Sequence, residues 1–232
     1  MMLKTPLPLL LTTLMSLNSY AALEDENNNL SLQDKDWQLV KKDNRHGITS
    51  YSKLEDGKSY RSFKAEVLYE QPFDVTACHQ LDANNFRKWF MNSKESRLLQ
   101  RVSDTEFYMY LRFKAPLAVP DRDVVLNVSI QPYSEKKPVL VISYKAVPDY
   151  LPPVSNVVRI PVWDVTTVIK PIDNQQSQEI TFGYAEAGKG HIPIWLINFF
   201  QKQMPYSNSL ARGRDLKTYQ VEAKNCDFKY KE

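Results

Sequence analysis

Apolar and polar residues alternate along most of the chain with the two-residue period of half-buried β-strands. Between 106 and 114, for example, Phe107, Met109, Leu111 and Phe113 share one face. The same pattern predicts strands over residues 37–42, 48–53, 63–69, 98–102, 106–114, 124–130, 139–146, 157–170 and 179–187. Most of the connections contain proline, which cannot donate to a strand ladder and therefore marks strand ends.

The period changes to that of a helix in two segments. Residues 72–90 predict two short helices. After Pro193, the residues Trp195, Leu196, Phe199 and Phe200 make a broad apolar stripe, which predicts a long amphipathic helix continuing to residue 216. Because proline removes one helical hydrogen bond, Pro205 predicts a kink or break near 201–204.

This order of elements defines the expected fold class. Three strands, two short helices, about six strands and one long helix form an α+β pattern, in which an antiparallel sheet buries one face against the terminal helix. No internal repeat interrupts the order, so one domain over 37–217 is expected. The polar residues 22–36 are expected to be a flexible acidic linker, and 218–232 a polar C-terminal tail.

The first 21 residues have the features of a signal peptide. Lys4 precedes an apolar stretch over 7–17, and Ser19-Tyr20-Ala21 fits the small-x-small cleavage pattern. The alternative, a membrane anchor, needs about 20 apolar residues, and this stretch is shorter. The mature protein is therefore expected to be periplasmic or secreted.

Composition and cysteine content narrow the function. A formal net charge of +3, spread as mixed signs, gives no reason to expect a nucleic-acid partner. Cys78 and Cys226 leave two interpretations open, a disulfide or a buried Cys78 with an unattached Cys226. The three histidines are scattered, without zinc-site spacing, so no metal or other cofactor is expected.

Four local motifs resemble those of the START (StAR-related lipid-transfer) family in order and spacing. They are the short-helix motif from Leu81 to Trp89, the Pro-x-Arg-Asp turn from Pro120 to Asp123, the stretch from Arg159 to Trp163, and the helix entry from Gly190 to Asn198 followed by Pro205. The resemblance covers about 37–216, and with the export signal it indicates an exported bacterial member.

What the resemblance implies is a helix-grip (START/Bet v 1-like) fold: a curved antiparallel sheet around a long C-terminal helix, with an internal hydrophobic cavity. Such a domain binds a lipid, sterol, quinone or similar apolar ligand and transfers or senses it. The resemblance also implies that the protein is a monomer and that it contacts membranes transiently. The residues expected to line the lipid site are Trp89, Phe107, Met109, Leu111, Phe113, Arg122, Leu126, Val128, Trp163, Trp195 and Phe199.

One departure bears on the ligand. Sterol-carrying members of the family place an acid and a base on two adjacent central strands, and by spacing those places fall near Met109 and Val128. Neither side chain orients a hydroxyl, so an apolar tunnel for acyl or isoprenoid chains is expected. Arg122, between two carboxylates, is interpreted mainly as a loop-pinning residue paired with Asp121 or Asp123, and alternatively as a phosphate ligand at the tunnel mouth.

Two other functions stay open at this point. One is a helix-grip enzyme, such as a cyclase, dehydratase or hydrolase that acts on an aromatic or polyketide-like substrate. Such an enzyme would need titratable side chains inside the cavity, and the sequence identifies no catalytic residues. A module that clamps another protein would have a filled cavity.

Overall fold

A computed structural model describes residues 36–115, 119–190, 192–222 and 226–232. The predicted signal peptide and nearly all of the predicted linker lie outside these residues. The chain divides after Trp37, and its helices and strands belong to the unit Gln38–Glu232. These elements are β1 (Gln38–Asp43), β2 (Ile48–Lys53), β3 (Ser62–Tyr69), α2 (Phe73–Leu81), α3 (Phe86–Trp89), β4 (Ser93–Ser103), β5 (Glu106–Phe113), β6 (Asp121–Gln131), β7 (Leu140–Ala146), β8 (Val157–Arg159), β9 (Trp163–Pro171), β10 (Ser177–Ala185) and α4 (Ile194–Leu216).

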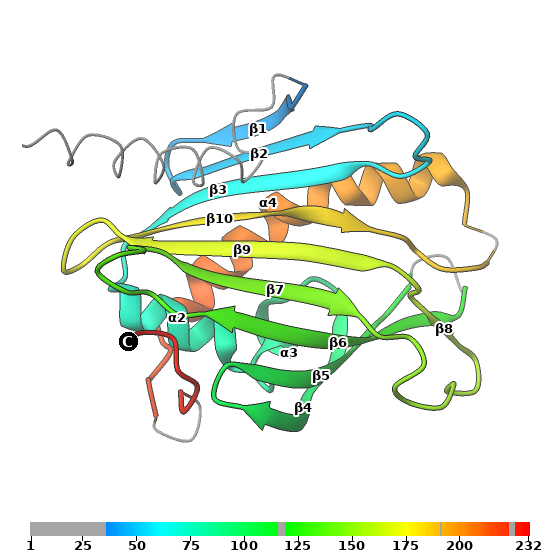
Figure 1. Cartoon of the computed structure of the whole chain (residues 1–232). Helices are drawn as coiled ribbons and strands as arrows, with labels where there is room; N and C mark the ends of the chain where they lie inside the picture. Colours follow the sequence, from blue (N-terminus) through cyan, green and yellow to red (C-terminus); the bar gives the residue numbers. More distant parts are fainter. Residues whose placement is uncertain (1–35, 116–118, 191, 223–225) are drawn as a thin grey trace, which may run out of the picture. The chain divides into compact units, whose positions relative to one another are not determined.

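All ten strands belong to one sheet, in the order β1-β2-β3-β10-β9-β7-β6-β5-β4, with β8 added beside β6 (Figure 1). Neighbours along this path are antiparallel, and the short β8 is parallel to β6. The pairing of β3 with β10 brings the first three strands next to the last one, so the sheet joins segments far apart in sequence.

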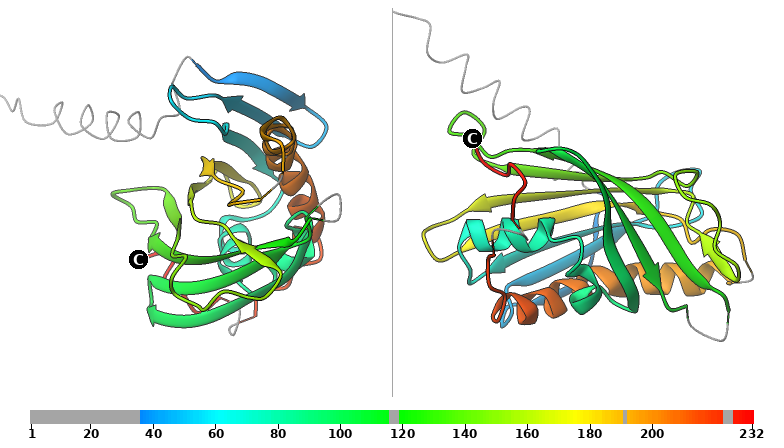
Figure 2. Two further views of the ribbon diagram at one scale, coloured as in Figure 1. Left: turned by 90° about the vertical axis from the view of Figure 1, so that its right-hand side faces the viewer. Right: turned by 90° about the horizontal axis from the view of Figure 1, so that it is seen from below.

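The sheet is strongly curved, and the helices lie on its concave side (Figure 2). Seen end-on, α4 runs across the open side of the curve, and α2 and α3 lie within it. The helix contacts β2 and β3 on one side and α2 and α3 on the other. This arrangement confirms the expected α+β helix-grip class.

Two expectations about individual elements are wrong. The strand predicted over 157–170 is two strands, β8 and β9, because Pro161 lacks the N–H needed to continue a ladder. The break predicted near 201–204 does not occur: α4 is a single helix from Ile194 to Leu216 with Pro205 inside it. Pro205 is buried, and the contacts of α4 with β2, β3, α2 and α3 support the helix where one hydrogen bond is lost.

The turn at 120–123 fixes the join between β6 and β8. Asp123, 1% exposed, accepts two hydrogen bonds from Arg159, at 2.8 and 3.1 Å, and one from the Tyr110 hydroxyl at 3.1 Å. Arg159 also donates to the carbonyl oxygens of Pro148 and Leu151. A bidentate arginine–carboxylate pair is geometrically specific, so this motif holds the 148–159 connection against β6.

The residues after α4 pack onto the domain, contrary to the expected polar tail. A disulfide joins Cys226 to Cys78 of α2. Phe228 is buried and stacks on Phe107 with ring centroids 4.4 Å apart, and Lys231 pairs with Asp74. The few apolar residues of this segment thus cover one end of the core. Over the described residues, no helix has the length and apolar character needed to span a membrane.

Candidate functional site

A cavity of about 240 Å³ lies between the concave face of the sheet and α4. By the usual measure, one water molecule needs about 10–15 Å³ of such volume. The interior is therefore hollow on a scale that admits a guest molecule.

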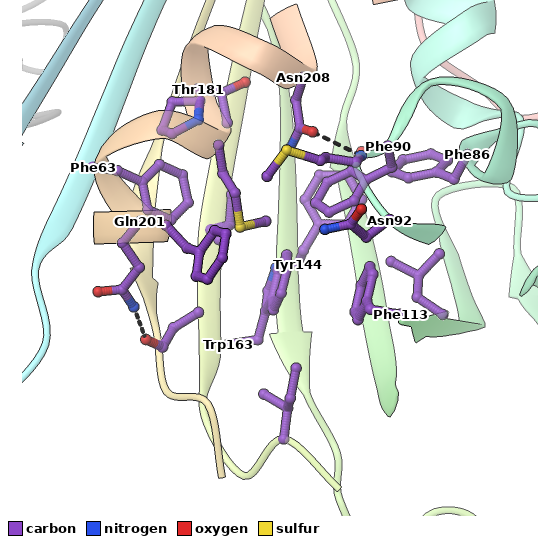
Figure 3. Close-up of a pocket in the computed structure, with 18 of the residues that line it drawn as sticks. Phe63, Phe86, Phe90, Asn92, Phe113, Tyr144, Trp163, Thr181, Gln201 and Asn208 are labelled. Atoms are coloured by element: carbon purple, nitrogen blue, oxygen red, sulfur yellow. Dashed lines mark hydrogen bonds between the residues drawn. The ribbon is translucent and has the colours of Figure 1, made fainter. Parts of the chain in front are cut away.

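The wall of this cavity is mostly aromatic and aliphatic (Figure 3). The sheet and α3 contribute side chains that face each other across the space, and Figure 3 shows Phe63 on one side and Phe86, Phe90 and Phe113 on the other. Its apolar members are Phe63, Ala65, Phe86, Trp89, Phe90, Met91, Leu111, Phe113, Ala115, Leu126, Ile160, Trp163, Val165, Ala185, Ala187, Ile192, Ile197, Phe200, Met204 and Pro205.

One end of the cavity reaches the surface. Asn92 and Lys114, both exposed, belong to its wall there. At this end Gln201 of α4 donates to the Ala185 carbonyl oxygen at 2.7 Å, which ties the helix to the end of β10 (Figure 3). We call this end the mouth.

Arg122 lies on the wall near the mouth and is 6% exposed. It donates to the carbonyl oxygens of Pro120 and Ala187. Burial lowers the pKa of its guanidinium. The expected pairing with Asp121 or Asp123 is wrong as a description of its contacts, since Asp121 pairs with Lys94 and Arg112, and Asp123 with Arg159. Arg122 does pin loops, through carbonyl oxygens instead of carboxylates.

The opposite end is closed and polar. It is formed by Tyr69, Gln80, Glu179 and Arg212, all at most 6% exposed. Ala185, near the mouth, follows Glu179 by six positions along β10, which at the rise of an antiparallel strand is about 20 Å. The cavity is thus an elongated apolar space with one end open to the surface and one buried polar end.

An ion pair between Arg212 of α4 and Glu179 of β10 forms the closed end. Arg212 also donates to the carbonyl oxygen of Thr76 at 2.8 Å and to Nδ1 of His79 at 3.1 Å. Burial lowers the pKa of Arg212, while the Tyr69 ring lies 5.2 Å from its guanidinium carbon. Each of these contacts compensates part of the cost of removing the charge from water.

His79 lies behind this pair and is fully buried. Its Nε2 lies 2.9 Å from Asp215, which also accepts from Asn85 at 2.7 Å. Burial, with the nearby Arg212 charge, lowers the pKa of His79 to about 3. The ring is therefore neutral, with Nε2–H donating to Asp215 and Nδ1 accepting from Arg212.

At the closed end of the cavity, these contacts leave neither Glu179 nor His79 poised as a general base. Glu179 is held by Arg212, and His79 is not part of the wall and has both ring nitrogens engaged. Burial also raises the pKa of the Tyr144 hydroxyl, which hydrogen-bonds with Gln80. The polar groups at the closed end are arranged to bind, since proton transfer requires a group whose pKa lies near the working pH.

Six of the eleven predicted lipid-site residues lie on the cavity wall: Trp89, Leu111, Phe113, Arg122, Leu126 and Trp163. Three others, Phe107, Met109 and Val128, are buried in the core outside that wall. The prediction that Trp195 and Phe199 cover the sheet is wrong, because they are 69% and 53% exposed. The buried face of α4 carries Ile197, Gln201 and Pro205 instead.

The expectation of an apolar tunnel with no acid and base inside it is also wrong. The places near Met109 and Val128 are apolar, but Glu179 and Arg212 supply an acid and a base from β10 and α4. A signal for them exists in the sequence. Arg212 falls in register with the buried positions 205, 209 and 216 of the helix, and Glu179 alternates with Ser177 and Thr181 on one strand face.

Known proteins share this fold. No protein-family model matches the chain. The solved structure of a STAR-related lipid transfer protein from Xanthomonas axonopodis, fragment 25–204, is 31% identical, with a TM-score of 0.70, and the match covers 79% of this chain and 99% of that one. Phosphatidylcholine transfer protein of Mus musculus is 25% identical over 176 residues, 74% of this chain and 79% of its own length.

More distant structures share the fold alone. Human StAR-related lipid transfer protein 5 is 14% identical but has a TM-score of 0.69, and the match covers 87% of this chain and 96% of that one.

Proposed function

Because the chain belongs to the StAR-related lipid-transfer family, we propose that it binds one lipid in the cavity between its sheet and α4 and transfers it between membranes. The observation that carries this proposal is the elongated hollow lined by aromatic and aliphatic side chains. Each ligand methylene moved from water into such a space contributes about 0.8 kcal/mol, so an acyl chain alone supplies a large binding free energy.

A carrier fits the site better than an enzyme does. Catalysis of a cyclisation, dehydration or hydrolysis requires a titratable group free to exchange a proton with the substrate. Of the ionisable groups at the closed end, Glu179 and Arg212 neutralise each other and His79 is bonded on both sides. The protein holds its ligand without changing it.

The start of α4 is the surface proposed for transient membrane contact. Ile194, Trp195 and Phe199 are 50%, 69% and 53% exposed, while Ile192 and Ile197 of the same segment line the cavity. Tryptophan and phenylalanine partition readily into the membrane interface. Insertion of this turn would bring the mouth to the lipid, with the protein acting as a monomer.

The proposed place of action is outside the cytoplasm. Residues 1–21 have the pattern of a signal peptide, and a disulfide such as Cys78–Cys226 persists in oxidising compartments. The mature protein works in the periplasm or after secretion.

Transfer of a fluorescent lipid from donor to acceptor vesicles tests the proposal. The full mature chain should accelerate transfer, and Ala65→Phe should slow it, because Ala65 is buried on β3 with its side chain on the cavity wall. Leu68→Phe is the matched control, since Leu68 lies on the same strand and is 42% exposed. The proposal fails if the wild-type protein transfers no lipid, or if a folded Ala65→Phe variant transfers as fast as the wild type.

A further inference from the structure

The closed end of the cavity has hydrogen-bond acceptors that no donor among the described residues satisfies. Oε1 of Gln80 is buried and has no hydrogen-bond partner there. Its orientation is fixed by Tyr144, whose hydroxyl accepts from Gln80 Nε2 at 2.9 Å and donates to the Gln80 carbonyl oxygen at 3.3 Å. A buried polar atom without a partner is destabilising, and a hydrogen-bond donor on a ligand would remove that cost.

Glu179 adds a second acceptor. One carboxylate oxygen, Oε2, accepts from Arg212. The other, Oε1, accepts no hydrogen bond from the residues that the structure describes, although Glu179 is 5% exposed and belongs to the cavity wall. A carboxylate has about four lone-pair sites, so unused accepting capacity remains at this end.

The donors of Arg212 at the closed end are, by contrast, already engaged, whereas the buried Nε1–H of Trp89, also on the cavity wall, has no hydrogen-bond partner among the described residues. Arg212 uses its Nε, Nη1 and Nη2 groups on His79, Glu179 and Thr76, respectively. Its positive charge is balanced by Glu179. A phosphate placed here would meet the Glu179 carboxylate and lose its own hydration, and both effects oppose binding. A quaternary ammonium has no N–H to offer the two acceptors.

We propose that the cavity selects an uncharged lipid whose polar end carries a hydroxyl or similar hydrogen-bond donor, and that this end enters first to lie against Gln80 and Glu179. The proposal rests on the proposed lipid-binding function and deepens it by naming the ligand class. Gln80 and Glu179 are then specificity-determining residues, and the apolar wall between them and the mouth receives the hydrocarbon part.

The test compares lipids that differ only in the donor. Affinity of the full mature chain is measured for a diacylglycerol, for its 3-O-methyl ether, and for phosphatidylcholine with the same acyl chains; a sterol and its methyl ether form a second pair. The alcohol of at least one pair should bind about tenfold or more tighter than its ether, since a hydrogen bond to a charged acceptor contributes about 1.5–3 kcal/mol. Phosphatidylcholine should bind more weakly than the diacylglycerol.

Variants assign the effect to the closed end. Gln80→Met and Glu179→Gln should each bring the ratio of alcohol to ether affinity closer to one. Glu186→Gln is the matched control, because Glu186 lines the same cavity near the mouth, beside Ala185 and Ala187, and should leave the ratio unchanged. Glu179→Gln removes the partner of a buried arginine, so Gln80→Met is the decisive variant where Glu179→Gln does not fold.

The ratio separates recognition from general damage, because a variant that only loosens the fold weakens alcohol and ether alike. Equal affinity for alcohol and ether in both pairs, or a preference for phosphatidylcholine, overturns the proposed selectivity while leaving lipid binding intact. Absence of binding to every lipid tested would instead overturn the proposed function itself.

Discussion

At the closed end, Arg212 is the centre of a hydrogen-bonded network of buried polar groups. Arg212 joins Glu179, His79 and the Thr76 carbonyl, and His79 continues to Asp215. In a low-dielectric interior such a network is stabilising only when each member keeps its partners. Protonation of His79 would therefore disrupt the hydrogen bonds of the whole network at the closed end.

Acidification should destabilise the fold through His79. Its pKa in the folded protein is lowered to about 3, whereas an unfolded histidine titrates near 6.5. The unfolded state thus binds a proton first, and stability present above pH 6.5 is lost as the pH falls toward 3. From pH 8 to pH 5 this residue should remove roughly 2 kcal/mol from the free energy of unfolding.

Urea unfolding at the two pH values measures this effect. His79→Gln should show a smaller loss of stability between pH 8 and pH 5 than the wild type. His46→Gln is the control, because the His46 side chain is 42% exposed in the turn after β1, and it should keep the wild-type difference. If His79→Gln and the wild type lose equal stability, His79 is not the group responsible.

Single residues on strands were the part of the site most accessible from the sequence. Leu111, Phe113 and Leu126 reach the cavity wall because alternation along β5 and β6 sets which face is buried. Met109 shares that face but is buried in the core instead. Alternation predicts which face of the sheet a side chain lies on. Whether that side chain reaches the cavity or packs in the core depends on its neighbours in the folded protein.

At the scale of elements, α4 shows what an apolar stripe leaves undetermined. Its first turns are apolar on two sides, with Ile197 buried and Trp195 and Phe199 exposed. The stripe predicts that the larger aromatic residues face the core, but the contact with the loop before β3 fixes the helix rotation differently. Asn198 and Gln201 both accept from the Arg61 backbone N–H at 3.0 Å. That contact joins segments far apart in the sequence, which no local pattern reveals.

The C-terminal segment is the element whose stability depends on a covalent bond. Cys226→Ala, or reduction of the wild type, should lower the free energy of unfolding by about 2–5 kcal/mol, since the disulfide closes a long loop between α2 and the segment. The stacking of Phe228 on Phe107 should weaken at the same time. Urea unfolding with and without reductant measures the loss, and limited proteolysis detects release of the segment.

Reductant should have no further effect on Cys226→Ala, which serves as the control for nonspecific action. An unchanged unfolding midpoint in the reduced wild type would show that the bond does not stabilise the fold.

At the scale of the whole molecule, the sheet and its terminal helix follow from local patterns. Alternation, proline positions and the helical stripe fix the order of elements, and that order allows few ways to bury one sheet face. The hollow interior does not follow from local patterns in the same way. It depends on the distance between α4 and the concave face of the curved sheet. Residues such as Phe63 and Phe90, which face each other across that space (Figure 3), look in the sequence like ordinary core residues.

Native mass spectrometry of the purified mature chain, before and after incubation with a mixed lipid extract, tests most directly whether that space holds a guest. The account predicts a complex of one lipid per chain for the wild type and for Leu68→Phe, and a strongly reduced one for Ala65→Phe. A wild-type spectrum that contains only the bare polypeptide after incubation, or an equal lipid complex in Ala65→Phe, would contradict it.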